Sequence, residues 1–336
     1  MIDNFILFFT LFEISAVPLF FVLLVYGLNP ERLNSFFYLY LFIYVRFFPS
    51  LLMVFLVKIT FLEGSINILV DLTNKKKINF FFILLIILTF LVKIPCFFFH
   101  TWLPKVHTES PVIGSMVLAR IYLKLGVFGL IKLEDLILNL NFRKILIYFF
   151  FSGGAVIRIL NSFQSDRKRI IAVSSVVHLS MLVGVIFLKI VRNLILLILI
   201  IGHRMISYMC FSLNYQIYKK FFSRCIVYFS SIVLSSPIII IMYTTAIVIN
   251  FSFPGVIRFW GEILRFSVLF NLGSPMVFLS LILVFFVILY SVNIISSSLN
   301  GLIKFRFVKD LNVFRPANFY IFIFISFPTI FLFFLF

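Results

Sequence analysis

The chain has 336 residues, of which 63% are hydrophobic and only 12% are charged. Soluble domains contain about 25% charged residues, so this composition excludes a soluble protein and indicates an integral membrane protein. A formal net charge of +18 would suggest a nucleic-acid partner in a soluble protein. Here most Lys and Arg residues lie in short loops between apolar runs, which membrane topology explains, so we expect no nucleic-acid partner.

The apolar runs predict an all-α polytopic membrane protein with about ten transmembrane helices, because one span needs about 20 residues. The runs lack the alternation of a β-barrel, and helices are the other structure that satisfies its backbone hydrogen bonds in lipid. We expect one helix bundle over residues 1–336. In chain order, the expected spans are 4–26, 34–58, 79–99, 110–132, 145–162, 169–189, 193–214, 228–269, 275–299 and 317–335.

The chain ends and loops predict a topology. The first apolar run follows no basic region and shows no small-residue cleavage site, so we interpret it as a first helix and not as a signal peptide. Lys and Arg are in excess on the face whose loops include Arg32, Lys105, Arg169 and Lys219, which places that face inside and both chain ends outside. The three cysteines show no CxxC or metal spacing, so we expect neither disulfides nor a metal site.

Two of the expected helices contain breaks. Proline removes a backbone donor, so Lys93–Pro95 is expected to interrupt one span and to leave polar backbone beside a lysine. The run 228–269 is too long for one straight helix, and Asn250, Pro254 and Gly255 divide it into two half-helices. Irregular backbone at membrane depth is tolerated only against protein or water, so both breaks are candidate functional positions.

Glu13, Lys93 and Lys124 each lie inside an apolar run, where a charge costs about 2.5 kcal/mol or more. Glu13 lies within the first span, and it could either stay ionised beside a lysine or make a helix-packing hydrogen bond. Lys93 and Lys124 could snorkel to the interface. However, Lys93 is about six residues from the expected helix end, and Lys124 is central in its span, so both positions disfavour snorkelling.

Two histidines and a second glutamate continue this pattern. His178 and His203 are single histidines in consecutive spans, and each could be a satisfied hydrogen-bonding group or part of a proton relay. Glu262 follows the second break by about two turns and would end such a relay. No nucleotide fingerprint, P-loop, haem pair or nucleophile with its base is recognisable, so we expect no bond chemistry within this chain.

Several longer motifs occur in a fixed order: Tyr26–Asn34, Lys93–Pro95, His100–Pro111, Leu123–Gly129, Phe163–Lys168, Ser174–His178, Gly202–His203 and Pro254–Glu262. In this order they resemble the chain 4 family of mitochondrial NADH:ubiquinone oxidoreductase, complex I. The resemblance covers residues 11 to about 270. It implies an antiporter-like inverted-repeat bundle in the mitochondrial inner membrane. The chain starts at what resembles the fifth helix, so the usual first four helices are expected to be absent.

The resemblance also implies roles for residues. The proton-translocating positions would be Glu13, Lys93, Lys124, His178, His203 and Glu262. Glu13 and Lys93 would form a carboxylate–lysine pair whose rearrangement alters the proton affinity of Lys93, which passes its proton toward Lys124. This chain would bind no cofactor, since NADH, FMN, the Fe–S clusters and ubiquinone would be bound by other subunits of the complex.

Two positions depart from the family, because Arg120 and Arg204 stand where small residues are common. A free-standing cation/proton antiporter is one alternative, and a structural membrane-arm subunit that no longer pumps is another. The implied partners are the membrane-arm chains 2 and 5, accessory subunits and lipids. Cardiolipin is the expected lipid beside the basic residues Lys219, Lys220 and Arg224.

Overall fold

The computed structural model describes residues 5–27, 31–60, 80–133, 143–188, 193–221, 223–226, 237–253, 256–270 and 272–299. Their regular secondary structure is helical, apart from an isolated bridge between Asp166 and Cys225, so the all-α prediction is confirmed. Among them, 7 helical runs are long and apolar enough to cross a membrane, and Leu84–Lys93 and Ile238–Asn250 are shorter apolar helices. The expected span 317–335 lies outside the described residues.

The chain divides into two compact units. The first unit comprises Met1–Gly154 and Leu179–Val191, and the second comprises Ala155–His178 and Arg192–Phe336. Helices α10 (Arg143–Ser162) and α11 (Arg167–Ile186) each pass from one unit into the other. The expectation of a single bundle over residues 1–336 stays a prediction.

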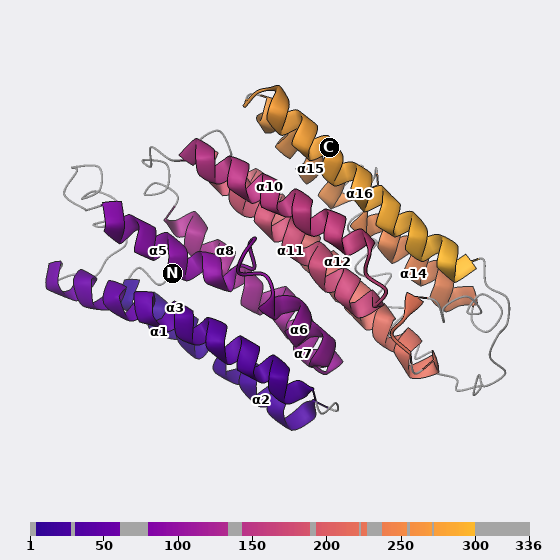
Figure 1. Cartoon of the computed structure of the whole chain (residues 1–336), viewed down its shortest axis with the longest axis horizontal. Helices are drawn as coiled ribbons and strands as arrows, with labels where there is room; N and C mark the ends of the chain where they lie inside the picture. The colour runs from indigo at the N-terminus through magenta and orange to yellow at the C-terminus, as the bar shows by residue number, and fades with distance from the viewer. Residues whose placement is uncertain are drawn as a thin grey trace. The chain divides into compact units, whose positions relative to one another are not determined.

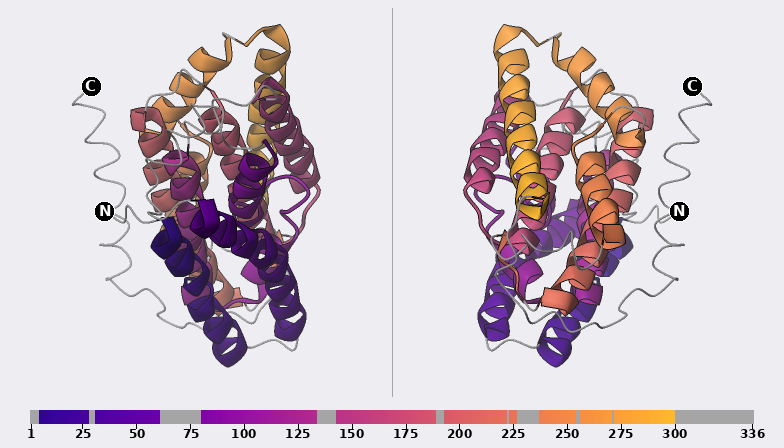
Figure 2. Two further views of the ribbon diagram at one scale, coloured as in Figure 1. Left: turned by 90° about the vertical axis from the view of Figure 1, so that its left-hand side faces the viewer. Right: turned by 90° about the vertical axis from the view of Figure 1, so that its right-hand side faces the viewer.

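The first unit is built around α3 (Arg32–Thr60), a 29-residue helix. Against it pack α1 (Phe5–Ile14), α2 (Val17–Tyr26), α5 (Phe80–Lys93) and α6 (Trp102–Glu109). Helices α1 and α2 follow one another along α3 (Figures 1 and 2).

The first span, predicted as one continuous helix, is interrupted at Ser15 and Ala16. Pro18 lies in the first turn of α2, and its ring excludes an unbroken helix because it clashes with the carbonyl four residues earlier. The backbone N–H of Ala16 bonds to the carbonyl of Glu13 at 3.1 Å instead of the Phe12 carbonyl. This break therefore leaves the Phe12 carbonyl open to other donors.

The break predicted at Lys93–Pro95 is confirmed, but the predicted span 79–99 is too long. Helix α5 ends at Lys93 itself, and Phe98 in the following segment has a φ of 75°. A non-glycine residue in the left-handed region costs about 1 to 3 kcal/mol, so the segment must be held by its surroundings. Lys93 thus lies at a helix end and not six residues from it.

The next span is continuous but not uniform. It consists of α7 (Val112–Val117), a π-helical turn η1 (Leu118–Tyr122) and α8 (Leu123–Lys132). Helix α8 packs against α5 through glycines. A Cβ atom on Gly126 would approach a side-chain atom of Ile94 to 2.8 Å, and one on Gly129 would approach the Phe90 ring to 2.1 Å.

Gly129→Ala is therefore expected to separate α8 from α5 and to destabilise the chain by about 1 to 3 kcal/mol, as overpacking does. The measurement is the midpoint temperature of the assembled membrane complex that contains this chain. Ile121→Ala removes an exposed side chain from the same span and is the matched control. Equal midpoints for Gly129→Ala and the unmodified chain would contradict this account of α5–α8 packing.

In the second unit, α12 (Asn193–Phe221) packs against α14 (Pro237–Asn250) and α15 (Ile257–Phe270). Helix α16 (Ser274–Leu299) packs against the same two half-helices (Figure 1). The predicted break between α14 and α15 is confirmed, although Pro254 and Gly255 lie outside the described residues. Ser252 has a φ of 65°, so this break also holds a non-glycine residue in the left-handed region.

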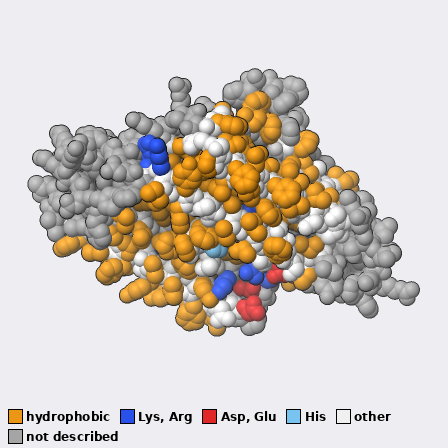
Figure 3. Space-filling model, turned by 45° about the horizontal axis from the view of Figure 1, so that its top comes forward, with side chains coloured by type: hydrophobic (Ala, Val, Ile, Leu, Met, Phe, Trp, Pro, Cys, Tyr) orange, Lys and Arg blue, Asp and Glu red, His pale blue; other side chains and the backbone are white. Residues whose placement is uncertain are grey.

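Much of the described surface is apolar, as expected for a membrane protein. Figure 3 shows a face covered mainly by hydrophobic side chains, with charged side chains gathered in small patches. Exposed aromatic residues contribute to this character, for example Phe21 at 65%, Phe48 at 66% and Phe278 at 66% exposure. Aromatic exposure of this extent suits contact with lipid or with other membrane subunits.

Candidate functional site

The first unit contains a buried polar cluster made of Glu13, Ser15, Arg46, Lys93 and Tyr122, hereafter the Glu13 cluster. Arg46 is at its centre and is 1% exposed. Its Nη2 lies 2.5 Å from Oε2 of Glu13, and its Nη1 donates to the Tyr122 hydroxyl at 3.3 Å. The carboxylate of α1 is thus neutralised by a guanidinium of α3.

Lys93 lies at the junction of two helix breaks in this cluster. Its Nζ donates to the Phe12 carbonyl at 3.0 Å and to the Ser15 hydroxyl at 2.9 Å. Both acceptors belong to the interruption between α1 and α2. The Phe12 ring centroid lies 3.5 Å from the ammonium, and the Tyr122 ring centroid lies 4.4 Å from it. With 1% exposure, Lys93 does not reach an interface by snorkelling in this structure.

The geometry adds a third member to the expected Glu13–Lys93 pair. Glu13 contacts Arg46, while Lys93 bonds to the backbone and hydroxyl next to Glu13. The carboxylate attracts the Lys93 ammonium electrostatically, and Arg46 repels it. Direct pairing of Glu13 with Lys93 stays a prediction. Sequence reasoning missed Arg46. The free-energy cost of a charge in the membrane, which singled out Lys93, applies equally to an arginine inside the span 34–58.

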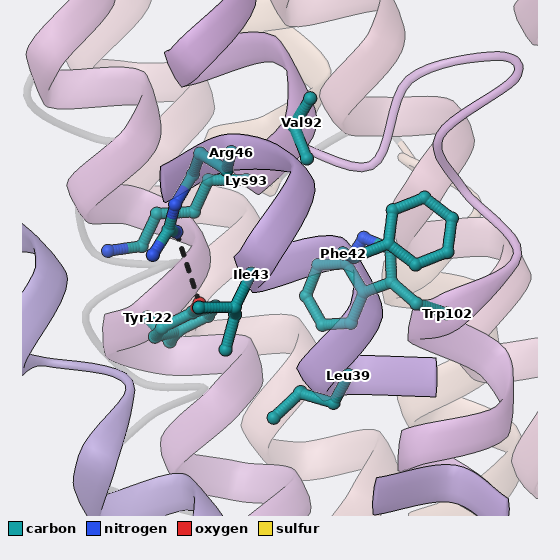
Figure 4. A pocket seen from close by; sticks show the side chains of 8 residues that line it. All are labelled: Leu39, Phe42, Ile43, Arg46, Val92, Lys93, Trp102 and Tyr122. Atoms are coloured by element: carbon teal, nitrogen blue, oxygen red, sulfur yellow. Dashed lines mark hydrogen bonds between the residues drawn. The ribbon is translucent and has the colours of Figure 1, made fainter. Parts of the chain in front are cut away.

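A small pocket opens beside Arg46 and Lys93 (Figure 4). Its volume is about 10 Å³, which is about the space that one water molecule needs. The pocket is lined by Leu39, Phe42, Ile43, Arg46, Val92, Lys93, Trp102 and Tyr122. The indole Nε1 of Trp102 and the Nε of Arg46 have no hydrogen-bond partner among the described residues. Polar donors beside a space of this size suit a bound water molecule.

Lys124 occupies a different environment in the same unit. It is half-buried near the start of α8, and its ammonium donates to the carbonyl of Ala119 in the π-helical turn. A π-helical turn inserts a residue into an α-helix, and such turns are frequent at functional sites. Arg120 is exposed. The two cations, four residues apart, therefore do not share one buried environment.

The second unit contains another buried polar cluster, made of Arg158, His178, Arg258, Glu262 and Arg265, hereafter the Glu262 cluster. Glu262 lies 3.4 Å from Nε of Arg258 and 3.9 Å from Nη2 of Arg265. The Nε2 atom of His178 contacts Arg258 closely and lies 3.4 Å from Nη2 of Arg158. Arg258 thus connects α15 with α11.

Three neighbouring groups complete this cluster. Arg258 donates to Asn250 Oδ1 at 2.8 Å, and Asn250 Nδ2 donates to the Tyr290 hydroxyl at 3.3 Å. The ring of His203 lies 6.1 Å from that of His178, edge to face. Asn250 is the last residue of α14, so the helix break positions the network.

The structure therefore brings His178, His203 and Glu262 into one neighbourhood within the second unit, with arginines between them. Sequence reasoning missed Arg158, Arg258 and Arg265. Each is an arginine within an apolar run, and the cost of a charge in lipid would have identified it. Arg204, by contrast, is exposed on α12.

The described residues offer no group of three or more His, Cys, Asp or Glu side chains that could hold a metal ion. Cys96, Cys210 and Cys225 are free thiols. The ionisable groups of both clusters can bind, release and orient protons, because carboxylates, histidines and buried lysines change their charge with their surroundings.

Comparison with known proteins identifies the family. Residues 3–289 match the family described as NADH:quinone oxidoreductase/Mrp antiporter, transmembrane. NADH-ubiquinone oxidoreductase chain 4 of Artemia franciscana is 32% identical over 300 residues, which cover 89% of this chain and 76% of that protein. Chain 4 of Locusta migratoria is 33% identical over 302 residues, which cover 89% of this chain and 67% of that protein.

Solved structures agree on the fold. A chain of respiratory complex I from Thermus thermophilus has a TM-score of 0.75 at 18% identity, covering 98% of this chain and 70% of that one. A chain of an archaeal membrane-bound sulfane sulfur reductase has a TM-score of 0.81 at 16% identity, covering 96% of this chain and 66% of that one. The resemblance stated from the motifs is confirmed: the chain belongs to the NADH:quinone oxidoreductase/Mrp antiporter membrane family, among the NADH-ubiquinone oxidoreductase chain 4 proteins.

Proposed function

We propose that this chain is a proton-translocating membrane-arm subunit of respiratory complex I in the mitochondrial inner membrane. The observation that carries the proposal is the placement of buried ionisable clusters at helix breaks, in a chain of this family. NADH oxidation and ubiquinone reduction take place in other subunits, which bind the NADH, FMN, Fe–S clusters and ubiquinone. This chain contributes proton transfer and no redox chemistry.

In the Glu13 cluster, we assign the coupling step to the Glu13 carboxylate. While it pairs with Arg46, its negative charge is held by a guanidinium that keeps its own proton at physiological pH. If the carboxylate turns toward Lys93, the proton affinity of Lys93 changes, because an opposite charge nearby favours the ammonium form. When the carboxylate returns to Arg46, that stabilisation of the ammonium is lost, and a proton released from Lys93 would pass toward Lys124.

In the Glu262 cluster, His178 and His203 act as proton carriers, and Glu262 is the terminal acid or base. His178 presents a lone pair at Nε2 toward the arginines, which requires the tautomer that carries its hydrogen on Nδ1. The rings of the two histidines are close enough for one water molecule to bridge them. The partners would be chains 2 and 5, accessory subunits and, beside Lys219 and Arg224, cardiolipin.

A specific observation favours a second candidate, a structural subunit that no longer pumps. Arginine cannot release its proton in a protein, and three arginines surround the proposed relay of His178 and Glu262. A free-standing antiporter has no such support from the geometry.

Lys124→Ala separates these candidates. The variant should assemble, because Lys124 is only half-buried, but NADH oxidation should no longer drive full proton pumping. The measurement combines a native gel with proton uptake by vesicles that contain the complex. Lys132→Ala, at the other end of α8, is the matched control and should pump normally. If assembly and pumping are both unchanged in Lys124→Ala, the proton relay is contradicted, and the chain is better described as a structural subunit.

A further inference from the structure

The Glu262 cluster contains more positive charge than its own carboxylate can neutralise. Arg158, Arg258 and Arg265 are 0%, 3% and 4% exposed, and Glu262 is the single carboxylate of the cluster as defined. Histidine adds no negative charge in any protonation state. Buried charges without compensation are costly, so the cluster requires a further negatively charged group that accepts hydrogen bonds from the arginines.

The hydrogen bonds of the Glu262 cluster also indicate that a negatively charged acceptor is missing. Guanidinium groups of Arg158 and Arg258 both approach Nε2 of His178. That nitrogen has one lone pair, so it can fully accept from one of them. Nε and Nη1 of Arg158 have no hydrogen-bond partner among the described residues. Two like charges thus meet at one weak acceptor while fully buried donors stay unsatisfied.

Among the described residues, the neighbours of Arg158 leave its Nε and Nη1 without an acceptor. Its guanidinium lies 5.5 Å from the centroid of the Tyr290 ring, and the Tyr290 hydroxyl already accepts from Asn250. The π-face attracts a cation weakly, by about 0.5 to 2 kcal/mol, and it is not a hydrogen-bond acceptor for Nε and Nη1. The Oδ1 atom of Asn250 in turn accepts from Arg258.

We propose that a small monovalent inorganic anion of about the size of chloride binds between Arg158 and Arg258, beside His178. An anion there accepts from both guanidiniums, and charge-assisted hydrogen bonds of this kind are stronger than neutral ones. The occupant is small because the Arg158 side chain is 0% exposed. A lipid phosphate or a carboxylate of another subunit would need access from outside. This site does not depend on proton transfer through the chain.

The test uses the intact membrane complex with the unmodified chain. Crystals of the complex equilibrated with bromide should show an anomalous difference peak in contact with the guanidiniums of Arg158 and Arg258. Full exchange back into a halide-free nitrate buffer should remove the peak. A position filled by a carboxylate of a neighbouring subunit, by a lipid phosphate, or by water without anomalous signal would overturn the proposal.

Variants give a second, independent readout. Arg158→Gln should lose the bromide peak, since glutamine carries no charge, whereas Arg204→Gln removes an exposed arginine of the same unit and should keep it. If Arg158→Gln fails to assemble, the bromide experiment on the unmodified complex still decides the question. Because the readout is bound halide and not pumping, loss of the peak and loss of proton translocation are distinguishable.

Discussion

Glu13→Gln is expected to destabilise the assembled complex by about 3 to 5 kcal/mol, because breaking a buried ion pair leaves a charge without compensation. Arg46 is 1% exposed, and its Nη2 lies 2.5 Å from the Glu13 carboxylate. Glutamine keeps the size of the side chain but cannot neutralise the guanidinium. The expected result is a sharp fall in assembled complex on a native gel and a lower midpoint temperature.

The double variant Glu13→Gln with Arg46→Met tests the cause. Removing both charges should restore much of the assembly, because a buried ion pair can often be replaced by apolar groups at little cost. Pumping should stay impaired, since the coupling carboxylate is gone. Glu109→Gln, at the end of α6, is the matched control and should assemble and pump normally. If the double variant is as unstable as Glu13→Gln alone, the ion pair does not explain the loss.

Arg258→Ala is expected to have an effect of similar size in the second unit. Its guanidinium contacts Asn250, His178 and Glu262, so one truncation removes a donor from three acceptors on α14, α11 and α15. Breaking a buried ion-pair network typically costs about 3 to 5 kcal/mol. The measurement is again the yield and midpoint temperature of the complex.

Two further variants define how specific this effect is. Arg258→Lys keeps the charge but loses the planar fork of donors, so its stability should fall between those of Arg258→Ala and the unmodified chain. Arg204→Ala removes an exposed arginine on α12 and should leave stability unchanged. A neutral result for Arg258→Ala would mean that repulsion among the arginines offsets the contacts of Arg258.

The sequence predicted those features of the fold that local chemistry decides. Apolar length located the spans, and proline and asparagine located the breaks after Lys93 and at Asn250. The interruption at Ser15 was missed, although Pro18 was visible, because a proline within a membrane span is often accommodated by a kink. The end of α5 at Lys93 itself depends on the packing of the following segment, which spacing does not reveal.

The sequence singled out some residues of the two buried clusters but not the groups that they contact. The cost of a charge in lipid identified Glu13, Lys93 and Lys124, and the same reasoning would have identified Arg46 and Arg258. Which carboxylate meets which cation depends on how distant helices face one another, as in the 2.5 Å contact between α1 and α3. No pattern in a single sequence contains that information.

We propose that the Glu13 cluster and the Glu262 cluster serve one proton route, and the most direct test is the number of protons translocated per NADH oxidised. Vesicles containing the complex with Lys93→Gln, with Glu262→Gln, or with both substitutions are compared at equal assembled complex. If one route is used, each single variant lowers the ratio by the same amount, and the double variant lowers it no further, because residues acting as one unit are not additive. Additive losses, or an unchanged ratio in either single variant, would contradict a shared route.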